Sequence, residues 1–301
     1  GRIAMMVPAE LLQVNYASEL REYLARKYSN LKVVTFRKLT FPGIQEETVL
    51  LLGVRQDSVA SEISFVELDG VEELSVPRVD STCTSHVRLN HGLEKWTQFF
   101  LTPKELGLIR ELESSDAFCK LGELAEVDVG VVTGRNKYFV LTQEEAKRFG
   151  IWQWCLPLVG RSAQIPGLLL RAEDWRTQAD AGAKCFLVQF GKVDRNELEA
   201  PQLTYVDYGE SERFHEGYKC RIRLPRWWNV PSVWQPDAFL LRQIYDSPRI
   251  VENRASVVCT DTIHRVRIRR GVDRSWLAAA SLNSLMLAFA EIRGRSYGGG
   301  V

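Results

Sequence analysis

The fold is decided by three apolar runs: IAMMV at residues 3–7, LKVVTF at 31–36 and TVLLLGV at 48–54. Their largely apolar character is typical of strands buried on both faces of a parallel sheet. Between the first two runs, residues 9–28 have an apolar stripe with helical spacing, which predicts a helix. The stripe consists of Leu12, Tyr16, Leu20, Tyr23 and Leu24. Strand, helix and strand in this order predict a parallel α/β sheet. Three strands leave an open edge, so we interpret the segment as the second half of a doubly wound domain.

The composition limits the class of protein. The chain has 301 residues, 45% of them hydrophobic and 26% charged, which excludes disorder and allows two domains. No run reaches the roughly 18 apolar residues that a membrane-spanning helix needs. The six cysteines lie tens of residues apart, so we expect reduced thiols and a cytoplasmic location. The chain has no initiator methionine and opens on a strand-like run, so we expect a fragment whose start lies upstream.

The character of the sequence changes beyond residue 56, where an acidic, polar stretch replaces the rhythm of strand and helix. We therefore predict a domain boundary near residue 75. The second domain, residues 76–301, has mixed α+β character. In it we expect two strands within 127–141, strand-like residues at 256–270 and a helix at 275–293.

Basic side chains are concentrated near the end of the chain. Residues 201–301 hold 15 basic and 10 acidic side chains, and every basic residue after Lys219 is an arginine. Arginine pairs with phosphate and with guanine edges through its planar fork, so this cluster favours contact with a nucleic acid. Codon bias is the alternative explanation, because arginine outnumbers lysine 28 to 11 in the whole chain.

Two arginine-rich segments each allow two interpretations. Arg265, Arg267 and Arg269 alternate with apolar residues and would share one face of a strand. That face could follow a phosphate backbone or be an ordinary solvated surface. Trp227, Trp228 and Trp234 lie among arginines, which suits stacking on bases. A core corner braced by prolines is the alternative, and we expect it for at least one of the tryptophans.

A polar, basic turn lies between the apolar runs of residues 127–141. Its residues Thr133, Gly134, Arg135, Asn136 and Lys137 combine close backbone approach with several hydrogen-bond donors. The alternative is an ordinary hairpin turn, which needs neither the arginine nor the lysine. Cys83, His86 and His91 do not have the spacing of a zinc site, so we expect no metal. The sequence also lacks a recognisable nuclease or Ser-His-Asp arrangement.

Taken in order, the motifs resemble gamma-class DNA adenine methyltransferases, the TaqI-like group, and in particular its XamI-like branch. The resemblance covers nearly the whole chain. In residues 1–54 it rests on Gly1-Arg2, Val7-Pro8, LREYL at 20–24, Phe41-Pro42 and the run at 48–54. It continues through VGVVTGRNKYFVL (129–141), PLVGRSAQI (157–165), YKCRIRLPRWW (218–228), SPR (247–249), CTDTIHRVRI (259–268), LNS (282–284) and GRSYGGGV (294–301).

The resemblance implies S-adenosylmethionine-dependent methylation of adenine in double-stranded DNA, within a restriction–modification system. It implies a partial doubly wound methyltransferase sheet in residues 1–75 and a DNA target-recognition domain in residues 76–301. Such an enzyme must extrude its target base from the stack. The resemblance gives the stacking role on that base to Phe41, with Pro42 shaping the loop. The implied DNA contacts are Thr133, Gly134, Arg135, Asn136, Lys137, Arg161, Arg226, His264, Arg293 and Arg295. A cognate restriction endonuclease is a further candidate partner.

The sequence departs from the family at its catalytic motifs. It holds neither the glycine-containing cofactor loop nor an Asn-Pro-Pro-Tyr-type motif, and it has no Pro-Pro dipeptide. We therefore expect no catalytic residue and no cofactor in this chain alone, and methyl transfer only in a full-length enzyme. The alternative is a non-catalytic DNA-binding specificity subunit that acts with a separate catalytic polypeptide.

Overall fold

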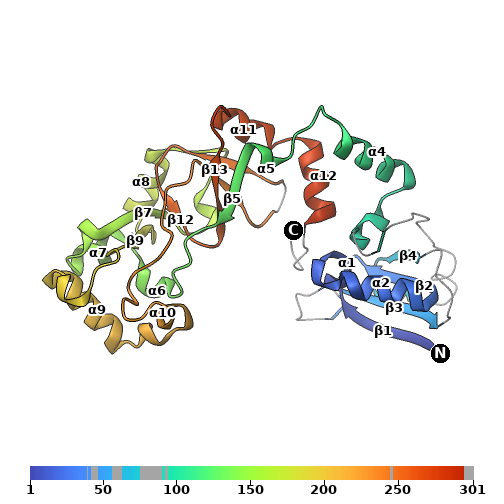
Figure 1. Ribbon diagram of the computed structural model, residues 1–301, viewed down its shortest axis with the longest axis horizontal. Helices are drawn as coiled ribbons and strands as arrows, with labels where there is room; N and C mark the ends of the chain where they lie inside the picture. The colour runs from blue at the N-terminus through green and yellow to red at the C-terminus, as the bar shows by residue number, and fades with distance from the viewer. Residues whose placement is uncertain are drawn as a thin grey trace. The chain divides into compact units, whose positions relative to one another are not determined.

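The computed structural model describes residues 1–38, 40–41, 47–55, 63–74, 90–91, 94–244 and 247–294. The chain divides into two compact units, shown with their elements in Figure 1. The first unit comprises Gly1–Phe118 and Ser284–Val301, and the second comprises Cys119–Asn283. The domain boundary that the sequence predicts near residue 75 lies outside the described residues and stays a prediction.

The first unit is built on a four-stranded sheet with the order β1-β3-β2-β4. Its strands are β1 (Arg2–Pro8), β2 (Tyr28–Phe36), β3 (Thr48–Arg55) and β4 (Ile63–Leu68). Its α-helices are α1 (Glu10–Gln13), α2 (Ser18–Lys27), α4 (Pro103–Ser114) and α12 (Ser284–Arg293). Its 3-10 helices are η1 (Asn15–Ala17), η2 (Val71–Glu73) and η3 (Trp96–Phe100). In Figure 1, α1 and α2 lie across one face of the sheet. The core between these layers includes Leu31, Leu51, Phe65, Trp96 and Phe99.

The three predicted strands are present, but the sheet is mixed rather than parallel. Strands β1 and β2 both pair with β3 in antiparallel fashion, and only β2 and β4 are parallel neighbours. The reason is the short connection between β2 and β3. A parallel connection needs a crossover of about a dozen or more residues, usually a helix, whereas a shorter link returns the chain in the opposite direction.

The expected burial of the first strand on both faces is wrong. Among the described residues, strand β1 lies at the edge of the sheet and pairs only with β3. The side chains of Met5 and Met6 are 51% and 39% exposed. An apolar run therefore does not establish burial on both faces, because an edge strand in the described sheet has the same composition.

The predicted helix over residues 9–28 is interrupted, and this changes which side chains face the core. Val14 is extended and separates α1 from the helical turns that follow. The helical phase restarts there, so Leu12 and Leu24 are buried, whereas Tyr16 is 75% exposed. Leu20 and Tyr23, also expected to face inward, are each 50% exposed.

A buried arginine closes this break. The guanidinium of Arg21, only 1% exposed, donates hydrogen bonds to the carbonyls of Leu11 and Val14, at 3.0 and 2.9 Å. These carbonyls lie where α1 ends, and helix ends leave carbonyls without partners inside the helix. Burial lowers the pKa of Arg21. Arg21 is therefore a structural core residue.

The second unit contains two sheets, with the orders β5-β13-β10-β11-β8 and β12-β7-β9-β6. Its strands are β5 (Ala125–Val129), β6 (Val140–Leu141), β7 (Cys155–Val159), β8 (Leu169–Leu170), β9 (Phe186–Val188), β10 (Ala238–Leu241), β11 (Ile250–Asn253), β12 (Val258–Cys259) and β13 (Ile263–Ile268). Its α-helices are α5 (Leu121–Leu124), α6 (Asn136–Phe139), α7 (Gln143–Arg148), α8 (Ala172–Asp180), α9 (Ala200–Ser211), α10 (Tyr218–Arg221) and α11 (Arg274–Ala280). Its 3-10 helices are η4 (Trp152–Trp154), η5 (Ser162–Gln164), η6 (Arg195–Glu197) and η7 (Phe214–Glu216). The predicted mixed α and β character is confirmed.

The last predicted helix, residues 275–293, is two helices. Helix α11 ends at Ala280 and belongs to the second unit, whereas α12 begins at Ser284 and belongs to the first. Within the described residues, no single helix has the length and apolar character to cross a membrane; α11 and α12 taken as one bent pair meet the test by length and composition only. The described cysteines are free thiols, of which Cys119 is exposed and Cys185, Cys220 and Cys259 are buried.

The main core of the second unit is aromatic and closely packed around α9. Tyr138 stacks on Tyr205 with ring centroids 4.6 Å apart, and Trp227 lies 4.9 Å from Tyr138. Gly209 of α9 is in contact with both rings. A Cβ at Gly209 would lie 2.5 Å from the Trp227 ring and 2.6 Å from the Tyr138 ring, so this helix needs a glycine to approach them.

We predict that Gly209→Ala lowers the free energy of unfolding by about 1–3 kcal/mol, because an added methyl group overpacks a rigid aromatic core. The matched control is Gly107→Ala in α4, where a Cβ meets nothing within 4 Å. There the substitution should stabilise the protein by up to about 1 kcal/mol through helix propensity. Urea unfolding followed by circular dichroism measures both changes. Equal effects of the two substitutions would contradict the packing argument.

Candidate nucleic-acid interface

The basic turn, residues 133–137, does not join a hairpin. The strand before it, β5, pairs with β13, whereas the strand after it, β6, pairs with β9 in the other sheet. Residues 136–139 form the short helix α6 instead of a strand. The predicted pair of strands around this turn is therefore corrected to strand, turn, helix and strand, with the turn linking two sheets.

Hydrogen bonds within the basic turn fix its shape. Thr133 is 1% exposed, and its hydroxyl donates to Asn136 Oδ1 at 2.5 Å. The same hydroxyl accepts the backbone N–H of Arg135 at 3.2 Å. Gly134 has a φ of +79°, in the left-handed region that favours glycine. The buried Thr133 side chain thus shapes the turn, and the side chains that reach solvent are those of Arg135, Asn136 and Lys137.

The basic turn is packed against α10 and the residues that follow it. A Cβ at Gly134 would lie 2.4 Å from Cβ of Lys219, and a Cβ at Gly217 would lie 2.6 Å from Nε of Arg135. Arg223 donates hydrogen bonds to the carbonyls of Thr133 and Val132, at 2.9 and 2.6 Å. Two segments about 90 residues apart in sequence therefore form one surface, which we call the turn–α10 surface and which comprises residues 133–137 and 217–224.

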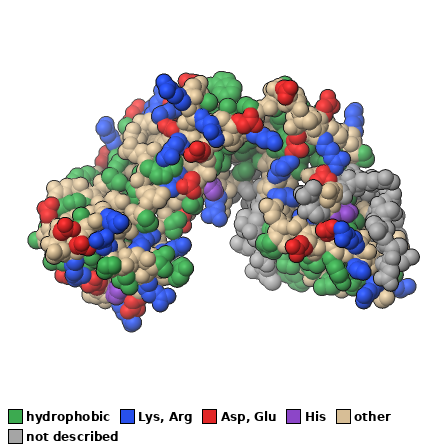
Figure 2. All heavy atoms as spheres, in the orientation of Figure 1, with side chains coloured by type: hydrophobic (Ala, Val, Ile, Leu, Met, Phe, Trp, Pro, Cys, Tyr) green, Lys and Arg blue, Asp and Glu red, His purple; other side chains and the backbone are tan. Residues whose placement is uncertain are grey.

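The turn–α10 surface is rich in exposed cations. Arg135, Lys137, Lys219 and Arg221 are exposed, and none of them has an ion-pair partner among the described residues. Glu216, a carboxylate close to Arg221, is already paired with Arg213 at 2.8 Å. Figure 2 shows blue basic and green apolar side chains mixed over the end of the second unit that carries α10 in Figure 1. Such a surface presents positive charge that the protein itself does not neutralise.

A further predicted residue, Arg161, lies on a loop that is linked to the segment before the basic turn. Residue Arg161 is exposed and follows Gly160, whose carbonyl accepts hydrogen bonds from the hydroxyls of Thr260 and Thr262, each at 2.8 Å. Thr260 also forms a bridge with Val131, two residues before the turn. The segment around Thr260 therefore connects the loop of Arg161 with the basic turn.

His264 and Arg226 lie in the same unit but in different settings. Half-buried His264 lies on β13 and is paired with Val129 of β5. The guanidinium of Arg226 donates to Asp194 at 2.7 Å, and this hydrogen bond lowers the pKa of the carboxyl. A salt bridge to Asp194 thus already engages Arg226.

The tryptophans separate into two groups, as the sequence suggested. Trp227 and Trp228 are 1% and 2% exposed and belong to the aromatic core, which confirms the core interpretation for these two. Trp234 is half-buried, and the guanidinium carbons of Arg265 and Arg267 each lie 4.4 Å from its ring centroid. Its stacking partners in the structure are therefore arginines of β13.

The alternating arginines of β13 are not one solvated or DNA-facing row. Arg265 is 3% exposed and donates to Asp128 at 2.7 Å, which lowers the pKa of Asp128. Arg269 donates to the carbonyl of Gly122 at 3.1 Å. Only Arg267 has an exposed side chain without a hydrogen-bond partner among the described residues. Both interpretations of the row are corrected, because Arg265 is a buried structural residue.

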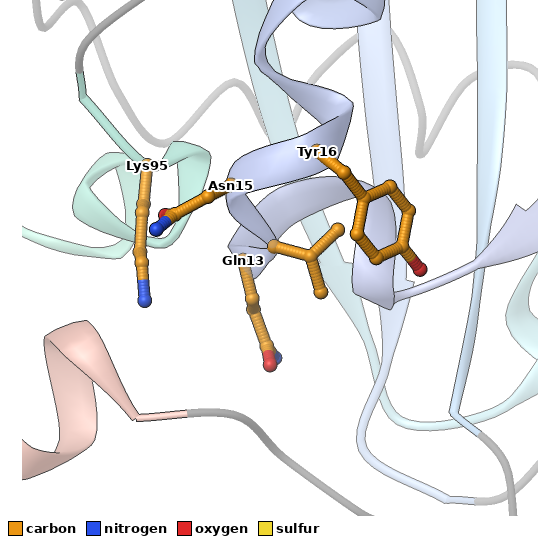
Figure 3. A pocket seen from close by; sticks show the side chains of 5 residues that line it. Gln13, Asn15, Tyr16 and Lys95 are labelled. Atoms are coloured by element: carbon orange, nitrogen blue, oxygen red, sulfur yellow. The ribbon is translucent and has the colours of Figure 1, made fainter.

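In the first unit, Phe41 follows the carboxyl end of β2 and is 42% exposed. Strands β1 and β2 run in the same direction, so the segments that follow them both start at the carboxyl ends of these strands. An open pocket of about 280 Å³ lies beyond the end of β1. It is lined by Gln13, Val14, Asn15, Tyr16 and Lys95. Figure 3 shows Lys95 entering from a separate segment opposite α1. Pro42 lies outside the described residues.

Charges of both signs lie near this pocket: the hydroxyl of Tyr16 donates to the carboxylate of Glu10 at 2.9 Å, and Lys95 has cations around it. Burial, together with the nearby cations Arg293 and Arg21, lowers the pKa of Lys95. The predicted contact residue Arg293 pairs with Glu113 and belongs to the first unit, apart from the residues of the basic turn. Arg295 lies outside the described residues.

Of the residues that superficially suggested a metal, the structure describes only His91. His91 Nδ1 accepts a hydrogen bond from the Trp96 indole at 3.2 Å, and burial lowers the pKa of His91. Cys83 and His86 lie outside the described residues. In the part of the chain that the structure describes, no group of three or more potential ligands could hold a metal ion.

Sequence reasoning missed the partnership between the basic turn and α10. It identified Arg221 and Arg223 as members of an arginine–tryptophan segment, but it did not place them against residues 133–137. The signal in the sequence that could have indicated this contact is the glycine in each segment. A Cβ at Gly134 or at Gly217 would collide with the other segment. Lys219 was not singled out as a contact residue, although it lies directly over Gly134.

Residues 93–301 match the family model described as "Type II methyltransferase M.Eco57I, C-terminal domain". A relative found among curated proteins is the type II methyltransferase M.AccI of Acinetobacter calcoaceticus, 20% identical over 312 aligned positions. The alignment covers all of this chain and 56% of that relative, so the chain spans little more than half the relative's length.

A solved structure with a similar fold is the type IIL restriction–modification enzyme MmeI in complex with DNA. It matches with a TM-score of 0.60 and 13% sequence identity, covering 99% of this chain and 37% of MmeI. At this level of identity the match establishes a shared fold. It extends over both compact units of the chain.

We predict that Gly134→Ala destabilises the second unit by more than 1 kcal/mol, because a left-handed residue with a Cβ costs about 1–2 kcal/mol and the new methyl group collides with Lys219. The control is Gly182→Ala, which has a φ of +81° but open space around its Cβ position. Gly182→Ala should therefore lose only the free energy that the left-handed backbone costs, without a steric collision. Thermal unfolding of both variants measures the difference. If Gly182→Ala is as harmful as Gly134→Ala, the turn is not tightly packed against α10.

Proposed function

The chain belongs to the family of type II methyltransferases described by the M.Eco57I C-terminal domain, and from this premise we propose that it is the C-terminal part of a site-specific DNA adenine methyltransferase of a restriction–modification system. In this proposal it supplies sequence recognition and one wall of the pocket for the extruded base. The catalytic motifs belong to the remainder of the enzyme.

The turn–α10 surface carries the DNA-binding part of the proposal. Four exposed cations lie there on a backbone that is fixed by Arg223 and by close glycine contacts. Phosphate contacts position a protein on DNA, whereas side chains that reach base edges specify the sequence. Arg135 can serve either purpose through its planar fork, while Lys137 and Lys219 act as point charges toward phosphate. We propose that Arg161, on the loop that Thr260 links to Val131, extends this surface.

Phe41 supports the base-pocket part of the proposal. Phe41 is exposed and follows the carboxyl end of β2, which points the same way as that of β1. Open α/β sheets bind their ligands beyond the carboxyl ends of their strands. An exposed aromatic ring can stack on an extruded base, an interaction worth about 1–3 kcal/mol. The open pocket lies beyond the carboxyl end of β1, and the side chains of Asn15 and Lys95 offer hydrogen-bond donors to it.

The edge strand supports the idea of a larger catalytic sheet. In the part of the chain that the structure describes, strand β1 pairs on one side only and exposes Met5 and Met6, as expected where further strands of a methyltransferase domain would add. S-adenosylmethionine would supply the methyl group in the full-length enzyme. The sequence holds no glycine-containing cofactor loop, so this chain's own contribution is to bind DNA and to hold the target base.

We predict that Arg135→Ala weakens binding of duplex DNA by about tenfold, because a hydrogen bond to a charged group is lost. Loss of a phosphate contact should also reduce the slope of log affinity against log salt by about 0.9. Fluorescence anisotropy between 50 and 200 mM salt measures both quantities. Arg176→Ala, an exposed arginine on α8, is the control and should bind like the wild type. Unchanged affinity of Arg135→Ala at moderate salt would remove the turn from the interface.

We predict that Phe41→Ala, made in the full-length methyltransferase, lowers turnover and base flipping, because the extruded adenine loses its stacking surface. Fluorescence of 2-aminopurine at the target position reports the flipping. Phe118→Ala, with a side chain 50% exposed in the same unit, is the control. A normal 2-aminopurine signal in Phe41→Ala would exclude Phe41 from the stacking role.

A further inference from the structure

Three large apolar side chains project from the middle of the turn–α10 surface. Tyr218 is 66% exposed, Ile222 62% and Leu224 57%. Tyr218 and Ile222 lie four residues apart, joined by a hydrogen bond from the Ile222 N–H to the Tyr218 carbonyl, so they share one side of the α10 turn. Leu224 follows two residues later. We call these three residues the apolar tip.

The apolar tip is held on a rigid base. Cys220, between its members, is completely buried, and Arg223 is anchored to the carbonyls of Val132 and Thr133. The next residues along the chain include Trp227 and Trp228 of the aromatic core. The exposure of the tip is therefore imposed by the packing of Cys220 and Arg223, which lie between its members and face inward.

Cations surround the apolar tip. The ammonium of Lys219 lies 5.6 Å from the centroid of the Tyr218 ring, and Arg135 lies across Gly217, which immediately precedes Tyr218. Arg221 lies within the tip segment itself and is exposed. A partner that fits this arrangement needs an apolar surface a few atoms wide, flanked by negative charges.

We propose that the apolar tip enters a groove of duplex DNA and contacts the bases while the surrounding cations bind the phosphates on either side. This rests on the proposed function and deepens it. A duplex offers that combination, since its grooves expose apolar base atoms and thymine methyl groups between two charged backbones. Isoleucine and leucine are also residues that DNA-binding proteins insert at base steps. A protein partner is less suitable, because a stable interface buries about 800 Å² on each side, more than three side chains supply.

The tip and the cations should differ in how salt affects their contributions. Phosphate contacts release counterions, so each one steepens the dependence of affinity on salt. Apolar contacts release no ions and should contribute equally at every salt concentration. This difference separates the proposal from a purely electrostatic role of the surface.

The test measures duplex binding of the full 301-residue chain between 50 and 200 mM salt. The double variant Ile222→Ala/Leu224→Ala should lose about tenfold in affinity at all salt concentrations, with an unchanged salt slope, since several buried methylene groups are removed. Lys219→Ala should reduce the slope by about 0.9. Leu108→Ala, a leucine 53% exposed on α4, is the matched control and should bind like the wild type. All three variants alter exposed side chains, and thermal unfolding verifies that they fold.

Three outcomes would overturn the inference. The first is a double variant that binds within twofold of the wild type, and the second is one whose salt slope falls as in Lys219→Ala. The third is a wild-type chain that self-associates in sedimentation while the double variant is monomeric, which would assign the tip to a contact between copies. If the wild type itself shows no salt-dependent DNA binding, the proposed function fails as well, and the two failures are thereby distinguished.

Discussion

The two hydrogen bonds from Arg223 to the carbonyls of Val132 and Thr133 are the constraint on which the turn–α10 surface depends. They join a turn that links two sheets to a segment about 90 residues later. Burial lowers the pKa of Arg223, so its charge is held in a partly desolvated position where the carbonyl dipoles stabilise it. Removing the guanidinium would leave two backbone acceptors without this partner and would release the turn from α10.

This constraint has an energetic consequence for binding. Side chains that must be ordered at an interface cost about 0.5–1.5 kcal/mol each, and a backbone that is already fixed avoids the larger cost of ordering a loop. Thr133, Gly134 and Gly217 all restrict the turn further, through an internal hydrogen bond or a close contact. The surface is therefore organised before a partner arrives.

Sequence patterns identified the strands of the first unit, since 31–36 and 48–54 lie within β2 and β3. The patterns failed where a break in the helix changes which side chains face the core. Extended backbone at Val14 shifts the helical phase, so Arg21 is buried while Tyr16, Leu20 and Tyr23 are exposed. They also failed for the edge position of β1, because composition does not specify how many neighbours a strand has.

The arginine cluster shows why a candidate site is harder to predict than a fold. The arginines near the end of the chain look alike in sequence but have different partners in the structure. Arg265 binds Asp128, Arg254 binds Glu252 and Arg226 binds Asp194. These pairs join residues that the sequence cannot place together, except for Arg254 and its near neighbour. Only the three-dimensional contacts distinguish a cation that stabilises the protein from one, such as Arg221, that is available to a partner.

The order of the two units along the chain has a consequence for how the proposed preference for a DNA sequence could change in evolution. The second unit, Cys119–Asn283, is continuous, whereas the first is assembled from segments on both sides of it, with α12 returning after the insertion. An inserted unit with a core of its own is connected to its host at two junctions only. Exchange of the second unit, which is the proposed recognition unit, between relatives therefore requires two crossovers, at 118/119 and 283/284, and leaves strands β1 to β4 of the first unit unaltered.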